Sequence, residues 1–247
     1  MPNNTQKNVL ITGAGKRLGA ASARALHARG CNIVVHCNQS LVEAKQLVAE
    51  LNALRPTSAV VLPADLLEVA AVQQLALAAE QIWGGIDILV HNASAFYPES
   101  IAQASEQSWE QLMGSNLKAP FFLTQALVPS LTARRGCIVH MVDIHAEKGL
   151  PGYPVYSIAK AGLEAMTRVL AKELAPAVRV NGIAPGAILW PEQDTDSDAQ
   201  QQILQRIALQ RVGDVQDITR ALSFLCFEAD YMTGQILKVD GGRTLFT

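Results

Sequence analysis

Short apolar segments alternate with longer segments of helical periodicity along almost the whole of this chain. Several of the apolar segments are unbroken, which is typical of strands that are buried on both faces of a sheet. Alternation of this kind predicts a parallel sheet with helices on both of its faces, an α/β fold. We expect strands at 9–12, 32–37, 59–62, 86–91, 137–142, 178–183 and 235–239, and helices near 17–29, 41–54, 69–83, 107–132, 154–175 and 215–227.

Length and composition suit one large α/β domain that spans residues 1–247. Hydrophobic residues make up 49% of the chain and charged residues 17%, which allows a substantial buried core. With a formal net charge of -2, the chain has no overall attraction to nucleic acid or to acidic membranes. Its N-terminus is polar and too short for a signal peptide, and no apolar run approaches the ~20 residues of a membrane span. We therefore expect a cytoplasmic protein.

The cysteines and histidines predict no metal site. The four cysteines form no Cys-x-x-Cys pair, and Cys31, Cys37 and Cys137 lie in or beside apolar segments. We interpret them as buried thiols of a protein from a reducing compartment. The five histidines are scattered and lack the spacing of metal ligands.

One segment, from Pro185 to Ala199, departs from the alternating pattern. It follows an expected strand, is long and polar, and becomes acidic towards its end. Open α/β sheets place their ligand-binding loops after the carboxyl ends of strands. We therefore interpret residues from about 186 to 199 as a flap over a substrate site. Trp190 lies within this segment, and two roles stay open for it: it covers a substrate, or it is a partly buried structural anchor.

A glycine-rich turn joins the first expected strand to the first expected helix, with the sequence Val-Leu-Ile-Thr-Gly-Ala-Gly-Lys-Arg-Leu-Gly from Val9 to Gly19. Gly13 permits a tight turn, and Gly19 lets the helix pack closely against the strand. The N-terminus of the helix offers free N–H groups and a positive dipole end to a pyrophosphate. In the first βα unit of an α/β chain, this loop predicts a dinucleotide site and a doubly wound, Rossmann-type sheet.

The end of the second expected strand indicates which dinucleotide is bound. NAD sites place an Asp or Glu about 20 residues after the glycines, where it holds the ribose 2′-hydroxyl. No acidic residue occurs between Arg17 and Glu43. We expect NADPH, because the side chains available there can donate hydrogen bonds to a 2′-phosphate, namely Arg17, Asn38, Gln39 and Ser40. The alternative is an ordinary surface turn.

Tyr156 and Lys160 stand at i and i+4 on one face of an expected helix. A phenol has an unperturbed pKa of about 10. We expect the Lys160 ammonium to lower the pKa of Tyr156, which would make the phenol a usable acid or base near neutral pH. On its own, the Tyr-x-x-x-Lys pattern is more typical of a solvated helix face.

Taken together, these motifs resemble the short-chain dehydrogenase/reductase family, and the resemblance extends from about Val9 to Gly242. Besides the glycine loop and the Tyr156/Lys160 pair, it is carried by His91-Asn92-Ala93-Ser94, Asn116, Pro185-Gly186 and Val239-Asp240-Gly241-Gly242.

The resemblance implies roles for individual residues. Asn116 would help to sustain a proton relay, Lys160 would also bind the nicotinamide ribose, and Asp65 and Leu66 would flank the adenine. It also favours a homotetramer. The expected cofactor-binding residues are Gly13, Arg17, Leu18, Gly19, Asn38, Gln39, Ser40, Asp65, Leu66, Asn92, Ala93, Ser94, Lys160, Pro185, Gly186 and Ile188.

Three departures from the usual family pattern agree with one another. Arg17 stands where the family commonly has the middle glycine of the loop, and Asp143 stands where a catalytic serine usually precedes the tyrosine. Ser94-Ala95-Phe96-Tyr97-Pro98 replaces the more common glycine-led turn. All three resemble the pteridine reductases, in which arginine touches cofactor and pterin, an Asp–Tyr–Lys trio works beside the nicotinamide, and an aromatic residue sandwiches the pterin.

The chemistry of the substrate accounts for the carboxylate. Reducing a carbonyl builds negative charge on oxygen, which Asp143 would repel, whereas reducing a C=N bond leaves a nitrogen that needs a proton. Asp143 can hold the aminopyrimidine edge of a pterin, support Tyr156, or share a proton with it. Structural roles stay open: Asp143 as a turn cap, Phe96 as core, and Arg17 as a solvated residue of the first helical turn.

We therefore expect an NADPH-dependent pteridine reductase of folate metabolism. It would act on dihydropterins, with oxidised pterins and dihydrofolate as further candidate substrates. Catalysis would use Asp143, Tyr156, Lys160 and Asn116, and the expected pterin-binding residues are Arg17, Ser94, Phe96, Asp143, Tyr156 and Trp190. One alternative is a carbonyl reductase acting on 3-oxoacyl thioesters, and another is a nucleotide-sensing regulator without turnover.

Overall fold

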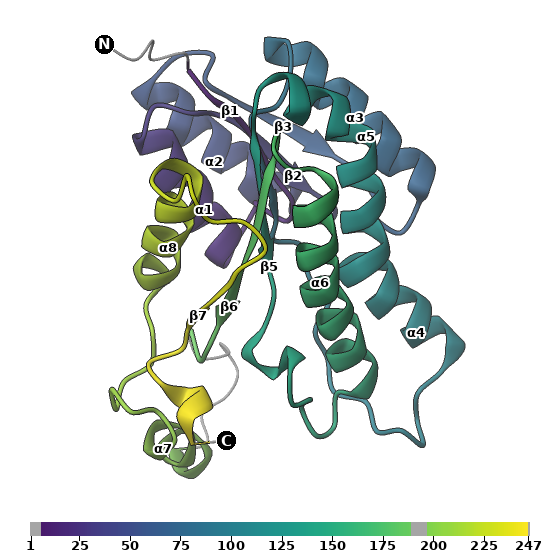
Figure 1. Cartoon of the computed structure of the whole chain (residues 1–247), viewed down its shortest axis with the longest axis vertical. Helices are drawn as coiled ribbons and strands as arrows, with labels where there is room; N and C mark the ends of the chain where they lie inside the picture. Colours follow the sequence, from purple (N-terminus) through teal and green to yellow (C-terminus); the bar gives the residue numbers. More distant parts are fainter. Residues whose placement is uncertain (1–5, 189–196, 247) are drawn as a thin grey trace.

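The computed structural model describes residues 6–188 and 197–246. These residues form one seven-stranded sheet in which every neighbouring pair is parallel, in the order β3-β2-β1-β4-β5-β6-β7 (Figure 1). The predicted Rossmann-type, doubly wound fold is confirmed. The strands are β1 (Asn8–Ile11), β2 (Asn32–Cys37), β3 (Ala59–Pro63), β4 (Ile88–His91), β5 (Cys137–Met141), β6 (Arg179–Pro185) and β7 (Ile236–Val239).

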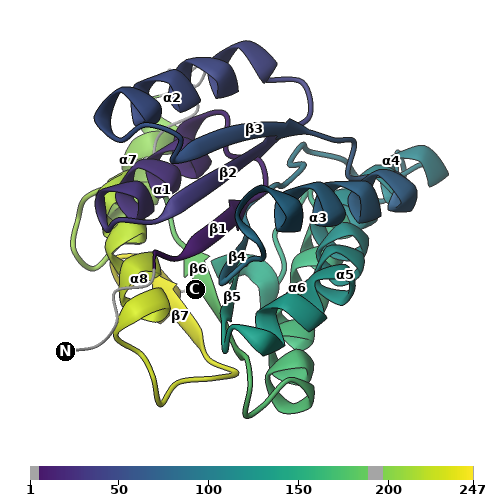
Figure 2. The same cartoon turned by 90° about the horizontal axis from the view of Figure 1, so that it is seen from above.

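Helices cover both faces of the sheet (Figure 2). One face carries α1 (Arg17–Ala28), α2 (Leu41–Leu54) and α8 (Val215–Phe227). The other carries α3 (Val69–Trp83), α5 (Ala119–Ala133) and α6 (Pro154–Glu173). Two further helices lie towards the end of the molecule at which the C terminus is found, α4 (Glu106–Met113) and α7 (Ser197–Gln205) (Figure 1).

The central strand β1 shows why the apolar segments are unbroken. Val9 and Ile11 belong to the apolar cluster under α1, α2 and α8, whereas Leu10 between them belongs to the cluster under α3, α5 and α6. Successive side chains of a strand point to opposite faces, so a strand covered on both faces needs apolar residues at every position.

The observed elements differ from the predicted ones in two places. The stretch expected as one helix is α4 and α5 joined by a π-helical turn at Gly114–Lys118. Helix α7 was not expected, because Ser197–Gln205 is short and has only two large apolar residues. Only its first three residues overlap the end of the segment interpreted as a flap, which was placed at about 186–199. Residues 189–196, which include Trp190, lie outside the described residues.

The sheet order places a crevice beside β1. The chain first adds strands on one side of β1 and then, from β4 onwards, on the other. Loops that follow β1 and β4 therefore leave the sheet in opposite directions, which is where open α/β sheets bind their ligands.

All four cysteines are buried free thiols, as the sequence predicts. Within the part of the chain that the structure describes, every helix is too short or too polar to cross a lipid bilayer.

Candidate active site

The glycine loop closes tightly against its neighbours. Gly13 has a φ of 63°, a left-handed conformation that glycine adopts without strain. A Cβ on Gly19 would lie 2.3 Å from the Gly13 carbonyl oxygen, so a side chain there would force the loop apart. Both glycines thus have the roles that the sequence predicts for them, the tight turn and the close packing of α1.

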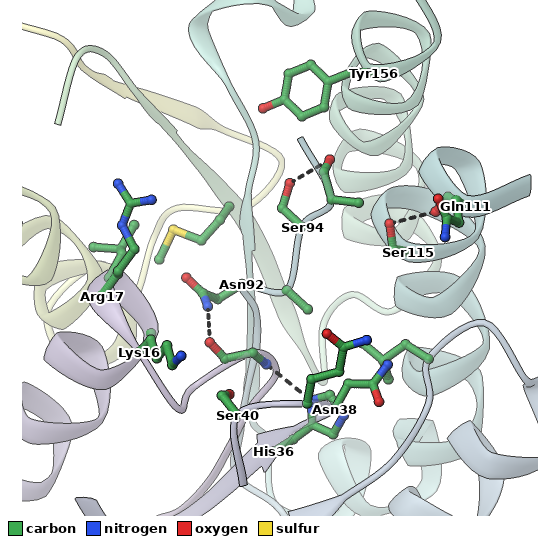
Figure 3. Close-up of a pocket in the computed structure, with 18 of the residues that line it drawn as sticks. Lys16, Arg17, His36, Asn38, Ser40, Asn92, Ser94, Gln111, Ser115 and Tyr156 are labelled. Carbon is green, nitrogen blue, oxygen red and sulfur yellow. Dashed lines mark hydrogen bonds between the residues drawn. The ribbon is translucent and has the colours of Figure 1, made fainter. Parts of the chain in front are cut away.

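Hydrogen bonds join this loop to the loop after β4. The Thr12 hydroxyl accepts from the backbone N–H groups of Asn92 and Ala93, both at 3.0 Å. The Asn92 amide donates in turn to the carbonyl oxygens of Thr12 (2.9 Å) and Gly13 (3.0 Å). The two edges of the crevice are therefore held in one fixed arrangement, which Figure 3 shows around Asn92.

His36, at the end of β2, supports the glycine loop from below. Its Nδ1 accepts the Gly13 N–H at 3.1 Å, and its Nε2 lies 3.1 Å from the Ala64 carbonyl oxygen. Because a backbone N–H only donates, Nδ1 carries no proton and Nε2 donates. Burial lowers the pKa of His36 and favours this neutral form. Sequence reasoning did not assign His36 a place in the site.

A cavity of about 870 Å³ runs along the carboxyl ends of the central strands. Figure 3 shows Ser40, Asn38 and Lys16 towards one end of it and Tyr156 towards the other. Residues from the predicted cofactor and catalytic sets that line it are Gly13, Arg17, Leu18, Gly19, Asn38, Gln39, Ser40, Asp65, Leu66, Asn92, Ala93, Ser94, Asp143, Tyr156, Lys160 and Pro185.

The cavity fits an elongated dinucleotide. A Cβ on Gly15 would lie 2.4 Å from the Ser40 hydroxyl oxygen and 3.1 Å from the Ser40 carbonyl oxygen, so the glycine loop approaches the loop after β2 closely at this end of the cavity. Arg17, Leu18 and Gly19 at the start of α1 line the cavity, and the first turn of a helix offers free backbone N–H groups to a pyrophosphate. The volume is also within the range of about 300–1,000 Å³ of small-molecule and cofactor sites.

An ion pair that the sequence analysis missed lies at the Ser40 end. Lys16 Nζ is 2.6 Å from a carboxylate oxygen of Glu43, and both residues line the cavity. Lys16 is the N-cap of α1, and Glu43 is in the first turn of α2. Figure 3 shows Arg17, by contrast, directed towards the Tyr156 end. The adjacent Lys16 and Arg17 in the glycine loop were a signal in the sequence that a cation could lie at each end of the cavity.

Asn116 lies in the π-helical turn between α4 and α5 and is buried. Its amide donates to the carbonyl oxygens of Leu112 (2.9 Å) and Ala95 (3.0 Å), and its Oδ1 accepts from the Ser94 hydroxyl at 2.6 Å. Single π-helical turns inside helices are frequent at functional sites, because the extra residue reorients side chains. Asn116 therefore does not line the cavity itself but reaches it through Ser94.

Asp143 and Tyr156 are joined directly. The Tyr156 hydroxyl donates to Asp143 Oδ2 at 2.7 Å, and Asp143 Oδ1 accepts the backbone N–H of His145 at 2.8 Å. Asp143 therefore caps the short 3₁₀ helix Ile144–Ala146 and also holds the tyrosine. The structure confirms the turn cap and the contact with Tyr156, and a role of Asp143 in the chemistry stays a prediction.

The expected effect of Lys160 on Tyr156 is wrong for this structure. Burial first, and then the charge and hydrogen bond of Asp143, raise the pKa of Tyr156 well above its ordinary value, and the Ser94 hydroxyl opposes them only in part. Lys160 Nζ donates to the Met141 carbonyl oxygen at 2.8 Å and lies 5.7 Å from the centre of the tyrosine ring. The phenol is therefore held in its protonated form.

Lys160 itself is buried on α6. Burial lowers the pKa of its ammonium from 10.5 to about 8, although the nearby Asp143 carboxylate acts in the opposite direction. The sequence showed that Lys160 follows Tyr156 by one helical turn, but it did not show that Lys160 is buried.

Phe96 is on the surface next to the cavity rather than in the core. Its ring is 55% exposed, stacks on Tyr153 with ring centres 4.5 Å apart and meets Tyr156 edge-on at 4.8 Å. The interpretation of Phe96 as a core residue is therefore wrong. Sequence reasoning missed Tyr153, and it also missed Tyr97, which lines the cavity.

Two residues of the predicted cofactor set do not line this cavity. Gly186 packs against the turn after β7, where a Cβ would lie 2.6 Å from Asp240 Cα. Ile188 lines a second cavity, of about 530 Å³, beside β7. The loop after β6 turns away towards β7 at this point, which the sequence pattern did not reveal.

Comparison with known proteins gives the family. A family model described as enoyl-(acyl carrier protein) reductase matches residues 13–244, which includes the glycine loop, Asp143, Tyr156 and Lys160. The chain belongs to the short-chain dehydrogenase/reductase family. It is an oxidoreductase of that family, whose members use nicotinamide cofactors. The resemblance seen in the sequence is thus confirmed.

Relatives within the short-chain dehydrogenase/reductase family carry two kinds of name. Pteridine reductase 1 from Leishmania tarentolae is 36% identical over 277 aligned positions, which cover 96% of this chain and 96% of that protein. A 3-oxoacyl-[acyl-carrier-protein] reductase from Synechocystis is 34% identical, with 98% of both chains covered. Another from Staphylococcus epidermidis is 31% identical, with 96% of this chain and 98% of the relative covered.

Proposed function

We propose that this chain is an NADPH-dependent pteridine reductase that reduces dihydropterins to tetrahydropterins, with oxidised pterins and dihydrofolate as further candidate substrates in folate metabolism. The observation that carries the proposal is the 2.7 Å hydrogen bond from the Tyr156 hydroxyl to Asp143. The similarity to pteridine reductase 1 supports it.

The carboxylate at position 143 favours a nitrogen substrate over an oxygen one. A carbonyl group that accepts hydride develops negative charge on oxygen, and a carboxylate beside it would repel that charge. A ring nitrogen in the same position becomes basic as it is reduced and requires a proton. Asp143 positions the Tyr156 hydroxyl at this place, so the hydroxyl is available to supply that proton.

The side chains at the Tyr156 end of the cavity have separate roles in the proposed reaction. When bound, NADPH would be the source of the hydride for a ring carbon of the pterin. Tyr156 donates the proton, Asp143 orients the hydroxyl and shares its proton, and Lys160 holds the nicotinamide ribose. Asn116 supports the relay through Ser94, whose hydroxyl it accepts at 2.6 Å.

Flat aromatic substrates have a surface to stack on at this end of the cavity. One face of Phe96 lies against Tyr153, and the ring is still 55% exposed. An aromatic stack contributes about 0.5–1.5 kcal/mol beyond the burial of its area. Phe96 would therefore hold the pterin ring, with Arg17 and Ser94 as polar contacts around its edge.

The Ser40 end supports NADPH over NADH. Ser40, Asn38 and Gln39 line it, and Lys16 adds a cation. Two carboxylates also line this end, namely Glu43, which pairs with Lys16 at 2.6 Å, and Asp65. A 2′-phosphate there would gain hydrogen bonds and a charge partner. Asp65 and Leu66 line the cavity beside Asn38 and would flank the adenine.

A second candidate function is reduction of 3-oxoacyl thioesters. It is favoured by the relatives named 3-oxoacyl-[acyl-carrier-protein] reductase at 31% and 34% identity. Asp143 argues against it, because that reaction needs a neutral donor near the developing oxyanion.

An assay of NADPH oxidation decides between the two. The wild-type protein should reduce dihydropterins and leave an acetoacetyl thioester unchanged. Asp143→Ser should keep the fold and NADPH binding while pterin turnover falls about 10²–10⁴-fold, the usual effect of losing one proton-transfer group. Brisk turnover of the thioester, without turnover of any pterin, would replace this proposal with the second candidate.

We also propose that the protein is cytoplasmic and that it forms a homotetramer. Large apolar side chains are exposed on α4, α5 and α6, namely Trp109, Phe121, Ile158 and Val169. Burial of such side chains between copies of the chain would stabilise an assembly.

A further inference from the structure

Tyr153 stands at the start of α6, where its backbone is held on both sides. It is the N-cap of the helix, and Pro154 follows at the first helical position with a fixed φ. The Tyr153 N–H donates to the Leu150 carbonyl oxygen at 3.0 Å, and the Tyr153 carbonyl oxygen accepts from the Ser157 hydroxyl at 2.8 Å. The half-buried ring of Tyr153 therefore projects from a rigid part of the fold.

Phe96, by contrast, projects from the long loop between β4 and α4. Residues 92–100 of this loop belong to no helix or strand. The ring is 55% exposed, so burial in the core does not fix its orientation. Ordering a side chain costs rotamer entropy, and an exposed ring in a loop keeps one orientation only where a neighbouring group holds it. The neighbour of Phe96 therefore decides whether a stacking surface exists before the substrate binds.

Two contacts tie this loop to the start of α6. The Phe96 ring stacks on Tyr153 with ring centres 4.5 Å apart and ring planes 6° from parallel. Three residues further along the loop, the Glu99 N–H donates to the carbonyl oxygen of Gly152, the residue before Tyr153, at 2.7 Å. The stack fixes the plane of the ring, and the hydrogen bond keeps the loop beside the helix. Tyr153 thus covers one face of Phe96, and the exposed part of the ring is left for a ligand.

The same arrangement relates the plane of Phe96 to the proton donor. Tyr156 follows Tyr153 by one helical turn, and the Phe96 ring meets the Tyr156 ring edge-on with centres 4.8 Å apart. The two tyrosine rings lie 6.5 Å apart and are inclined at 70° to each other. Because both tyrosines belong to the start of one helix, the plane of Phe96 is set with respect to Tyr156.

We propose that Tyr153 is a positioning residue for the substrate, because it holds Phe96 in the plane on which a flat aromatic heterocycle stacks. This inference rests on the proposed pteridine reductase function and adds a residue that sets its affinity for the substrate. Tyr153 acts through Phe96 and does not touch the reacting atoms. A surface that is oriented in advance binds without the cost of ordering it, so the stack in the free protein strengthens substrate binding.

The test measures KM and kcat separately, with NADPH and 6-hydroxymethyl-7,8-dihydropterin as the substrates. Tyr153→Leu removes the stacking ring but keeps an apolar side chain, so KM for the pterin should rise about 2–10-fold, the effect of losing one oriented aromatic contact. The kcat and the affinity for NADPH should stay close to those of the wild type, because a surface that binds substrate and transition state equally affects KM alone. Tyr153→Phe keeps the ring and should keep the wild-type KM.

A double-mutant cycle shows whether Tyr153 acts through Phe96. Phe96→Leu alone should also raise KM for the pterin. Adding Tyr153→Leu to it should change KM little further, because Tyr153 then has no ring to hold. Two effects on KM that multiply in the double variant would show that the residues act independently, and that result overturns the inference.

The controls separate the possible failures. Tyr231→Leu makes the same change at a fully exposed position and should keep the wild-type KM. Urea unfolding reports on packing at the start of α6, and Tyr153→Met replaces Tyr153→Leu if that variant does not fold. Wild-type turnover of the pterin with an unchanged KM in the Tyr153 variant, whatever its stability, overturns the inference alone. If calorimetry of the NADP⁺-bound protein finds no pterin bound and none is turned over, the inference and the proposed function both fail.

Discussion

Asp143 influences the protonation state of Tyr156 in the free protein. It accepts the phenolic hydrogen at 2.7 Å, and together with burial it raises the pKa of the tyrosine. In the free protein the phenol therefore keeps its proton. That assignment suits a reaction in which the substrate gains a proton, and it differs from the lysine-activated tyrosine that the spacing of the two residues suggests.

Replacing Tyr156 by Phe tests this role directly. The variant keeps the ring in its buried position but loses the proton, so turnover should fall about 10²–10⁴-fold while the affinity for NADPH stays close to that of the wild type. Stopped-flow turnover and fluorescence titration measure the two quantities. Tyr231→Phe, at an exposed position, is the control. Near-normal turnover in Tyr156→Phe would show that the hydroxyl is structural.

Lys160 gives the free protein a pH-dependent stability. Its pKa is about 8 in the folded protein, below the 10.5 of an unperturbed lysine. Above about pH 10.5 both states are neutral and the folded state has no buried charge. As the pH falls to about 8 the unfolded chain takes up the proton first, so the wild type loses stability across this window.

Lys160→Met removes that titration. From pH 8 to pH 10.5 the unfolding free energy of the wild type should rise relative to the variant by on the order of 3 kcal/mol, since one pKa unit corresponds to about 1.4 kcal/mol. Urea unfolding of both proteins at a series of pH values measures the difference. If the two unfolding free energies change in parallel over this range, folding does not shift the pKa of Lys160.

At the residue scale the sequence predicted identities better than environments. Tyr156 and Lys160 are found by their spacing, and Asp143 by its departure from a pattern. The pKa directions of Tyr156 and Lys160 depend on depth, which spacing does not contain. The Lys16–Glu43 pair joins two elements through a loop contact, so neither residue shows its partner in the sequence.

At the scale of elements, the strands were the most predictable part. Each expected strand matches an observed one, because a strand covered on both faces is apolar throughout. The π-helical turn at Gly114–Lys118 was not predictable, since helical periodicity continues through it while a single residue is added. Asn116 was nevertheless identified by its family resemblance. Helix α7 is short and mostly polar, so it has too few apolar residues to be predicted.

The loops after β1 and β2 should act together in choosing the cofactor. Lys16, at the N-cap of α1, lies on the cavity wall with Ser40 and Glu43 of the following βα unit. Lys16→Ala should weaken NADPH binding about 10-fold or more and leave NADH binding nearly unchanged, because the lost hydrogen bond involves a charged group and a phosphate that NADH lacks.

Glu43→Gln is the matched variant for this pair. It removes the carboxylate that neutralises Lys16, so NADPH affinity should be maintained or increased. Isothermal titration of each protein with both cofactors provides the comparison. Equal weakening of NADPH and NADH by Lys16→Ala would mean that Lys16 only supports the loop.

At the scale of the whole molecule, the two faces of the sheet differ in what covers them. The outer sides of α4, α5 and α6 carry exposed aromatic and branched residues, including Trp109, Phe121, Ile158 and Val169. The face with α1, α2 and α8 also has exposed apolar residues, such as Leu54 at the end of α2. If the chain forms the proposed tetramer, we expect the α4–α6 side to be the one that pairs, because its exposed residues come from neighbouring helices.

The assembly gives the last prediction. A charge placed among apolar side chains that become buried would be desolvated without a partner, so Ile158→Asp together with Val169→Asp should shift the protein from tetramer towards smaller species. Light scattering coupled to size-exclusion chromatography measures the mass at several concentrations. Leu54→Asp, which adds a charge at an exposed apolar position on the other face, should leave the mass unchanged. Circular dichroism distinguishes dissociation from unfolding. A wild type that is monomeric at all concentrations, or a double variant with the wild-type mass, would place the interface elsewhere or remove it.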